Sequence, residues 1–126
     1  MARPTTPHPT NSEFAILRVL WERGSATVRD VHGIVSEESG VSYTTVLKTM
    51  QIMLDKSLLK RDDSQRSHLY SAAVNQTVAQ TQLLKRVLDM AFEGSIAKLV
   101  QGAIQGRAAS AKELNEIQKL IKEHQS

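Results

Sequence analysis

Side chains that can hydrogen-bond to a polar partner are concentrated between residues 42 and 51. Three hydroxyl groups come first, on Ser42, Thr44 and Thr45. An ammonium group and an amide follow, on Lys48 and Gln51. Hydroxyls and free backbone N–H groups at the start of a helix can hold a phosphate, lysine can donate to guanine, and glutamine can pair bidentately with adenine. The chemistry that this segment predicts is recognition by hydrogen bonding.

Catalytic and metal-binding patterns are not evident in the sequence. Ser, His and Asp residues occur, but no stretch has the spacing of a nucleophile elbow or of an acid–base pair, so we expect no enzyme activity. The four histidines are scattered without the i, i+4 spacing of a metal site, and there is no cysteine to supply a thiolate ligand. We therefore expect neither a metal nor another cofactor.

The composition predicts a small, mainly helical protein. A chain of 126 residues suits one domain or a small domain with an appendage, and 40% hydrophobic but only 4% aromatic residues favour helices over a β-sandwich or barrel. The N-terminus has no apolar signal segment, and no stretch is long and apolar enough to span a membrane, so we expect a cytoplasmic protein. The net charge of +3 permits a polyanionic partner without requiring one.

Three short helices are predicted after a flexible arm of residues 1–9, which contains three prolines. Each helix follows a residue suited to capping its first turn, namely Thr10, Thr27 and Ser42. Gly40 supplies a left-handed stop, so the link between the second and third helices must be a sharp turn. The three helices are expected to end near Arg23, Ser39 and Lys56.

The third helix is expected to have two chemically different sides. Its helical period points apolar residues into the core, namely Val46, Met50, Met53 and Leu54. The opposite side is expected to expose Tyr43, Thr44, Leu47, Lys48 and Gln51.

A hairpin is predicted after the helices, with strands at 58–61 and 68–72 around a polar turn at 62–66. An isolated hairpin is marginally stable, so the side bearing Leu59, Leu69 and Tyr70 is expected to pack on the helices. The basic side chains of the hairpin are placed to neutralise phosphates, and they are Lys60, Arg61, Arg66 and His68. Helices joined by a tight turn and followed by a hairpin form a winged helix-turn-helix, here residues 10–74, whose recognition helix enters the DNA major groove.

A simpler interpretation of the polar face is an ordinary solvent-exposed surface, where Thr, Lys and Gln are common. The carboxylates of Asp55, Asp62 and Asp63 also argue mildly against DNA binding, because they repel phosphate. The full order of helices, turn and hairpin favours DNA binding over that interpretation. The alternative from another class of function is a winged helix that binds a protein and has no DNA target.

Three amphipathic helices are predicted within residues 75–126. So short a region buries too little surface to form a core of its own, so we expect its apolar side to pack against a second copy of the chain. The same stripe of leucine and isoleucine could instead be intramolecular core. The expected dimerisation residues are Leu84, Leu88, Phe92, Leu99, Val100, Leu114, Ile117 and Ile121.

Four segments of the sequence resemble a known family over nearly the whole chain, from about Ser12 to Ile121. They are "SEFAILRVLWERGSATVRDVH", "YTTVLKTMQIMLDKSLLKRD", "RSHLYSA" and "AFEGSIAKLV". The family is that of the penicillinase and methicillin-resistance repressors (BlaI/MecI), which includes copper-responsive repressors of the CopY type. The resemblance implies a homodimeric repressor of a palindromic operator in double-stranded DNA, with a winged helix domain followed by a three-helix dimerisation domain. It implies a DNA face at Ser42, Tyr43, Thr44, Thr45, Lys48, Gln51, Arg66 and His68.

Two departures from the family pattern bear on regulation. Copper-responsive relatives carry a cysteine pair near the C-terminus, which this chain lacks, so copper sensing through thiolates is ruled out. In β-lactam-responsive relatives a membrane sensor protease cuts the dimerisation domain at an Asn-Phe bond, and the aligned residues here are Gly102 and Ala103. The Asn-Phe bond is thus absent, which argues against a cut at this bond. The resemblance still implies derepression by proteolysis of the dimerisation domain in response to a cell-wall or antibiotic signal, with the cut near Gly102 and Ala103, and the alternative is an inducing signal of another kind.

Overall fold

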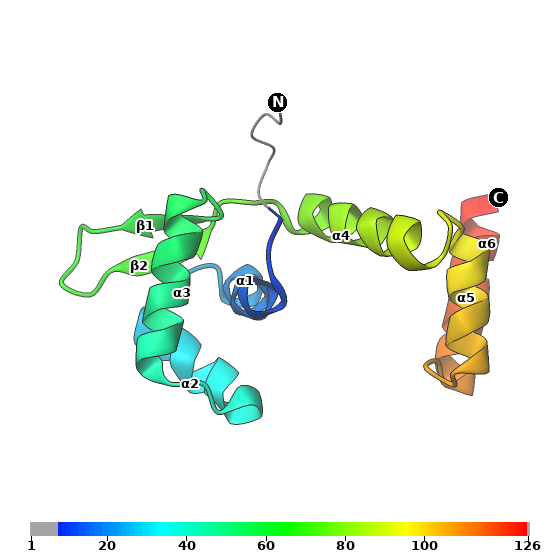
Figure 1. Cartoon of the computed structure of the whole chain (residues 1–126), viewed down its shortest axis with the longest axis horizontal. Helices are drawn as coiled ribbons and strands as arrows, with labels where there is room; N and C mark the ends of the chain where they lie inside the picture. Colours follow the sequence, from blue (N-terminus) through cyan, green and yellow to red (C-terminus); the bar gives the residue numbers. More distant parts are fainter. Residues whose placement is uncertain (1–7, 126) are drawn as a thin grey trace. The chain divides into compact units, whose positions relative to one another are not determined.

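The computed structural model describes residues 8–125. Apart from its last two residues, the arm predicted at residues 1–9 lies outside the described residues. The described chain is mainly helical, with six helices and one two-stranded sheet (Figure 1), which confirms the predicted fold class. It divides into two compact units, of which the first ends at Gln80 and the second begins at Thr81.

Local capping chemistry sets the ends of the three helices of the first unit. They are α1 (Asn11–Arg23), α2 (Val28–Ser39) and α3 (Tyr43–Asp55). Thr10 and Thr27 each form a reciprocal capping box with the third residue of the helix, and the Ser42 hydroxyl caps α3. Gly40 ends α2 with a φ of 68°, a left-handed conformation that glycine adopts without a steric penalty. The predicted helix starts and the stop at Gly40 are confirmed.

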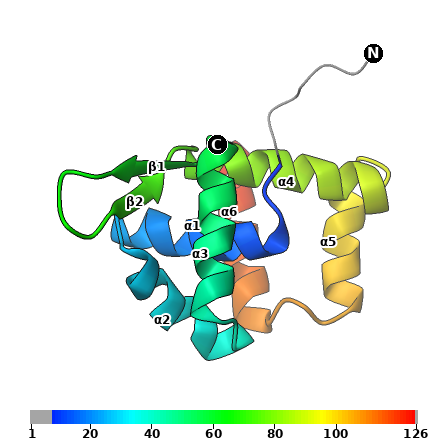
Figure 2. The ribbon, with the colours of Figure 1, turned by 60° about the vertical axis from the view of Figure 1, so that its left-hand side comes forward.

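The predicted antiparallel hairpin is formed by β1 (Leu59–Asp62) and β2 (Leu69–Ala72). Tyr70 also pairs with Ala26, in the link between α1 and α2, through two backbone hydrogen bonds of 2.8 and 2.9 Å. This extra pairing anchors the base of the hairpin to the helices. The turn of the hairpin extends beyond the three helices of this unit (Figure 2).

Two predictions about which side chains face the core are wrong. Leu69 and Tyr70 cannot both face the helices, because successive residues of a strand point to opposite faces. Tyr70 is buried with Leu59, whereas Leu69 is only half-buried. In α3, Leu47 is not fully outside as expected, since it is half-buried against the core, and Leu54 is half-buried rather than buried.

The core of the first unit joins the three helices to the hairpin. Its largest fully buried side chains are Leu17, Leu20, Val31, Val46, Met50, Met53 and Leu58. α1 also meets the end of α3 at an ion pair, where Lys56 Nζ lies 2.9 and 3.1 Å from the carboxylate oxygens of Glu13. The indole N–H of Trp21 donates to the carbonyl oxygen of Val74 at 3.0 Å, which ties the chain after the hairpin to α1. These contacts hold the apolar side of α3 within its own unit.

The second unit contains the end of α4 (Gln76–Ala91), together with α5 (Ile96–Gln105) and α6 (Ala111–Gln125). Among the described residues of this unit, Leu88 is the one that is buried. Large apolar side chains are instead exposed, namely Leu84, Met90, Ile96, Ile104, Leu120 and Ile121. No helix in the described part of the chain is long and apolar enough to cross a membrane.

Candidate nucleic-acid interface

The exposed side of α3 carries three of the polar residues that the sequence predicts for recognition. Thr44, Lys48 and Gln51 are all exposed, and their spacing of four and three residues puts them on one face of the helix. The opposite side of α3 is held in the core, where Val46 and Met50 are 2% and 0% exposed. None of the three polar side chains has a hydrogen bond or an ion pair with another described residue, so their donors and acceptors are available to a partner.

The hydroxyl of Ser42 is engaged within the chain. It accepts the N–H of Thr45 at 3.2 Å and donates to the Thr45 hydroxyl oxygen at 3.0 Å. Ser42 therefore acts first as the cap of α3, as predicted from its position. Any contact that it makes with a phosphate has to share this hydrogen-bonding capacity.

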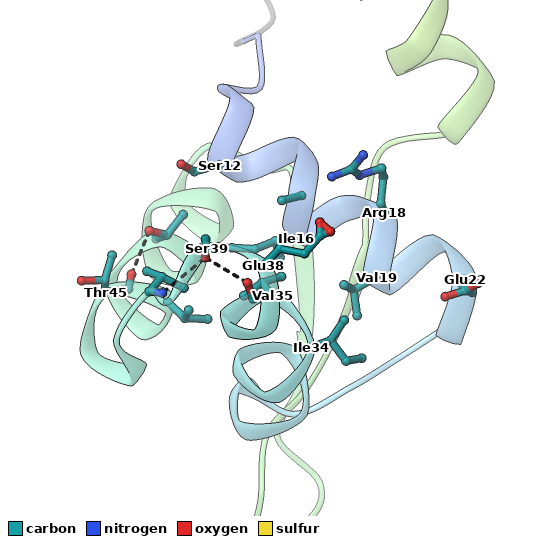
Figure 3. Close-up of a pocket in the computed structure, with 14 residues that line it drawn as sticks. Ser12, Ile16, Arg18, Val19, Glu22, Ile34, Val35, Glu38, Ser39 and Thr45 are labelled. Atoms are coloured by element: carbon teal, nitrogen blue, oxygen red, sulfur yellow. Dashed lines mark hydrogen bonds between the residues drawn. The ribbon is translucent and has the colours of Figure 1, made fainter. Parts of the chain in front are cut away.

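Thr45 lies on a different flank of α3 from the recognition residues. It lines a pocket of about 470 Å³ between α1, α2 and α3, which we term the helix pocket (Figure 3). The apolar residues that line the pocket include Ile16, Val19 and Ile34. The charged residues that line it are Arg18, Glu22 and Glu38. The charged groups of the helix pocket are thus of both signs, with more acidic than basic side chains.

A second cleft, of about 450 Å³, separates α3 from the hairpin, and we term it the wing cleft. It brings together three residues that the sequence predicts for the DNA face, namely Tyr43, Arg66 and His68. The start of α2 contributes Arg29, which the sequence analysis does not single out. The complete lining is Thr27, Val28, Arg29, Tyr43, Leu47, Arg66, Ser67, His68 and Tyr70.

A histidine in α2 holds the turn that leads into α3. His32 Nε2 lies 3.0 Å from the carbonyl oxygen of Val41. The ring of His32 also meets the ring of Tyr43 edge to face, with 5.7 Å between the ring centroids. Tyr43 is therefore supported by His32 while 45% of its surface stays exposed. No local sequence signal indicates this role, because the contact depends on how the turn folds back on α2.

Asp63, in the turn of the hairpin, pairs with two of the predicted basic residues. Its Oδ1 lies 2.7 Å from Arg61 Nε and 2.5 Å from His68 Nδ1. Desolvation raises the pKa of Asp63, but the hydrogen bonds and charges of Arg61 and His68 outweigh it, so the pKa lies below its ordinary value. Hydrogen bonds to Tyr70 and then to Asp63 raise the pKa of Arg61. The repulsion of phosphate by Asp63 is thus offset by its two partners.

The other hairpin residues do not form one basic patch. Lys60 and Arg61 are neighbours in β1 and point to opposite faces, so they cannot line the same side of the hairpin. Asp62 accepts hydrogen bonds from the Ser64 side chain and backbone, which lower the pKa of Asp62. Arg66 lines the wing cleft without an ion pair or hydrogen bond to another described residue. The basic side chains of the hairpin therefore lie on different surfaces.

The predicted dimerisation residues of the second unit differ in exposure. Leu88 is buried within the chain, whereas Leu84 and Ile121 are 42% and 51% exposed. The remaining five are half-buried, and they are Phe92, Leu99, Val100, Leu114 and Ile117. The apolar side of these helices is thus only partly covered by the chain itself.

The residues of the predicted cleavage region, Gly102 and Ala103, lie inside α5. Gly102 faces the ring of Phe92, since a Cβ atom built on Gly102 would be 3.3 Å from Phe92 Cε1. A protease needs an extended substrate backbone, so cleavage at this bond requires local unwinding of α5.

Known proteins share this arrangement of helices and hairpin. A family model described as "Penicillinase repressor" matches residues 9–123. Among solved structures, wild-type MarR from E. coli in its apo form is similar, with a TM-score of 0.53 and 13% identity over 91% of this chain and 76% of MarR. A mutant of E. coli MarR complexed with operator DNA has a TM-score of 0.51 and 15% identity over 90% of this chain and 74% of that one. No curated protein matches the chain.

Proposed function

Because this chain belongs to the penicillinase repressor family, we propose that it represses transcription as a homodimer bound to a palindromic operator in double-stranded DNA. The observation that carries this proposal is the free polar face of α3, with Thr44, Lys48 and Gln51, on the helix that also walls the wing cleft. The major groove admits one α-helix, and lysine and glutamine match the donors and acceptors of guanine and adenine there. The apolar side of α3 keeps the helix in its own unit while the polar side reads the groove.

Selection of bound duplexes from a random-sequence pool tests the proposal and identifies the operator in the same experiment. We expect the selected sequences to share two half-sites related by two-fold symmetry, with centres separated by whole helical turns of about 10 base pairs. Enrichment of a sequence without two-fold symmetry would contradict a homodimer on a palindrome. Failure to enrich any sequence would contradict sequence-specific binding and favour a protein partner.

A second copy of the chain is the proposed cover for the apolar side of the second unit. Leu84 and Ile121 are about half exposed, at 42% and 51%, although they belong to helices with strongly apolar sides. Two half-site contacts joined in one dimer gain affinity through effective concentration, which neither contact supplies alone. We expect the full chain carrying Leu84→Glu and Ile121→Glu to sediment as a monomer and to bind the selected duplex far more weakly. A variant that stays dimeric and binds as tightly would exclude this face as the interface.

Derepression is proposed to follow when the dimerisation region is cut, at or near Gly102 and Ala103, by a membrane sensor protease that responds to a cell-wall or antibiotic signal. A cut in or after α5 would separate α6 from the rest of the chain and remove part of the apolar face. Replacing residues 106–110 with the recognition sequence of a site-specific protease tests this step directly. Cleavage is expected to release the duplex, and retention of the duplex by the cut protein would contradict the mechanism.

A further inference from the structure

We propose that Arg29, at the start of α2, binds a phosphate of the DNA backbone, and that this backbone passes through the wing cleft between Arg29 and Arg66. The inference rests on the proposed function and adds a residue from outside the recognition helix and the hairpin. Arg29 and Arg66 are far apart in the sequence but line one cleft of about 450 Å³ with Tyr43 of α3.

The charge of the wing cleft matches a polyanion. The charged side chains among its lining residues are those of two arginines, Arg29 and Arg66, and the imidazole of His68 lies in the same lining. No described residue that lines the cleft is acidic. On the other flank of α3, the helix pocket has two carboxylates, Glu22 and Glu38, against one guanidinium, Arg18, so it is less favourable to a phosphate. The backbone that flanks a major groove occupied by α3 is therefore favoured on the flank of the wing cleft.

The position of Arg29 is not explained by the stability of the fold. It is exposed and makes no hydrogen bond or ion pair with another described residue. It lies in the first turn of α2, where the helix dipole favours anions and disfavours a cation. The neighbouring Asp30 is held in the capping box with Thr27 and does not pair with Arg29. A phosphate would give the guanidinium of Arg29 the anionic partner that it does not have within the described chain.

The guanidinium of Arg66 likewise makes no hydrogen bond or ion pair with another described residue, whereas His68 is paired with Asp63. Arg29 and Arg66 are therefore the two cations of the wing cleft whose donors are unused. Arginine suits this role because its planar group can donate two parallel hydrogen bonds to one phosphate.

The salt dependence of binding to a random-sequence duplex tests the proposal, because non-specific affinity comes from phosphate contacts. The full chain and its variants are titrated with a labelled duplex of about 30 base pairs, or three helical turns, between about 50 and 200 mM salt. Each lost contact between a basic side chain and a phosphate is expected to reduce the magnitude of the slope of log K against log salt by about 0.9. Because each substitution is present in both subunits of the proposed dimer, Arg29→Gln should reduce the slope by about 1.8, and Arg29→Gln with Arg66→Gln by about 3.6.

Two matched variants separate a phosphate contact from general loss of charge. Arg29→Lys keeps the positive charge and should keep the slope, and Arg18→Gln removes a charge from the helix pocket and should also leave the slope unchanged. Equal midpoints of thermal unfolding check that the exposed substitutions preserve the fold. An unchanged slope in Arg29→Gln, with steep salt dependence in the parent chain, would overturn the assignment of Arg29 and leave the proposed function standing. Absence of salt-dependent binding in the parent chain would overturn the proposed function itself.

Discussion

The ion pair between Glu13 and Lys56 should stabilise the placement of α3, and its removal can be measured. The Glu13 side chain is 4% exposed and that of Lys56 is 30% exposed, with 2.9 Å between Lys56 Nζ and Glu13 Oε2. Substitution Lys56→Met keeps most of the aliphatic stem but leaves the buried carboxylate with only the backbone N–H of Thr10, 2.9 Å away. The carboxylate would then lose two charge-assisted hydrogen bonds.

The magnitude follows from the burial of the two partners. Removing one partner of a fully buried pair costs about 3–5 kcal/mol, but Lys56 is partly hydrated, so the cost must be smaller. A hydrogen bond to a charged group contributes about 1.5–3 kcal/mol. We therefore expect Lys56→Met to lower the free energy of unfolding by about 2 kcal/mol.

Urea unfolding followed by tryptophan fluorescence is a suitable assay, because the chain has one tryptophan and it lies in α1 of the same unit. Lys48→Met is the matched control, since Lys48 is an exposed lysine of α3 without an ion pair in the described chain, and its change should stay within about 0.5 kcal/mol. Lys56→Met should cost much less when Glu13→Gln is already present, because no buried charge is then left unpaired. Equal losses with and without Glu13→Gln would refute the ion pair as the cause and point to the packing of the lysine stem.

Three further outcomes are expected from single residues. Gln51→Ala should weaken binding to the selected duplex by about 1–3 kcal/mol in fluorescence anisotropy with unchanged unfolding, and unchanged affinity would remove Gln51 from the interface. Gly40→Ala should destabilise the first unit by about 1 kcal/mol in urea unfolding, because Gly40 has a φ of 68° that alanine adopts only with strain. Gly33→Ala, inside α2, should instead stabilise the same unit by up to about 1 kcal/mol. Equal effects of the two substitutions would exclude backbone strain as the cause. Asp63 should keep its contacts with Arg61 and His68 as the pH falls through the ordinary carboxyl range, and lose them only as the pH falls through the lowered pKa of Asp63. In an NMR titration, Arg61→Ala should raise the pKa of Asp63. An unchanged pKa would argue against the ion pair.

The helices and their limits can be predicted because their signals are local. The hydroxyls of Thr10, Thr27 and Ser42 cap helices by hydrogen bonds to residues only three positions further along the chain. Gly40 ends α2 through its own left-handed backbone conformation. The polar face of α3 is equally accessible, since helical geometry alone brings residues spaced by three and four onto one side. The resemblance to a repressor family is also carried by local segments and is confirmed by the match over residues 9–123.

The position of the hairpin in the sequence can be predicted, but which face of its strands packs on the helices cannot. Its polar turn and apolar flanks are visible in the sequence, yet the inward side of a strand depends on which partner covers it. Ala26 pairs with Tyr70 and helps to set that side, and no pattern near either residue indicates a contact between positions so far apart. The sequence pattern therefore places Leu69 inside, although it is only half-buried.

The sequence by itself determined the helices, the tight turn, the polar side of α3 and the family, since each depends on neighbours within a few residues or on the order of such segments. Only the tertiary structure decided that Arg29 lines one cleft with Arg66, that Asp63 pairs with Arg61 and His68, and that Glu13 is joined to Lys56. These groups have no regular spacing that could signal their meeting. Their distances are set by how the three helices pack on the hairpin, which is a property of the whole core.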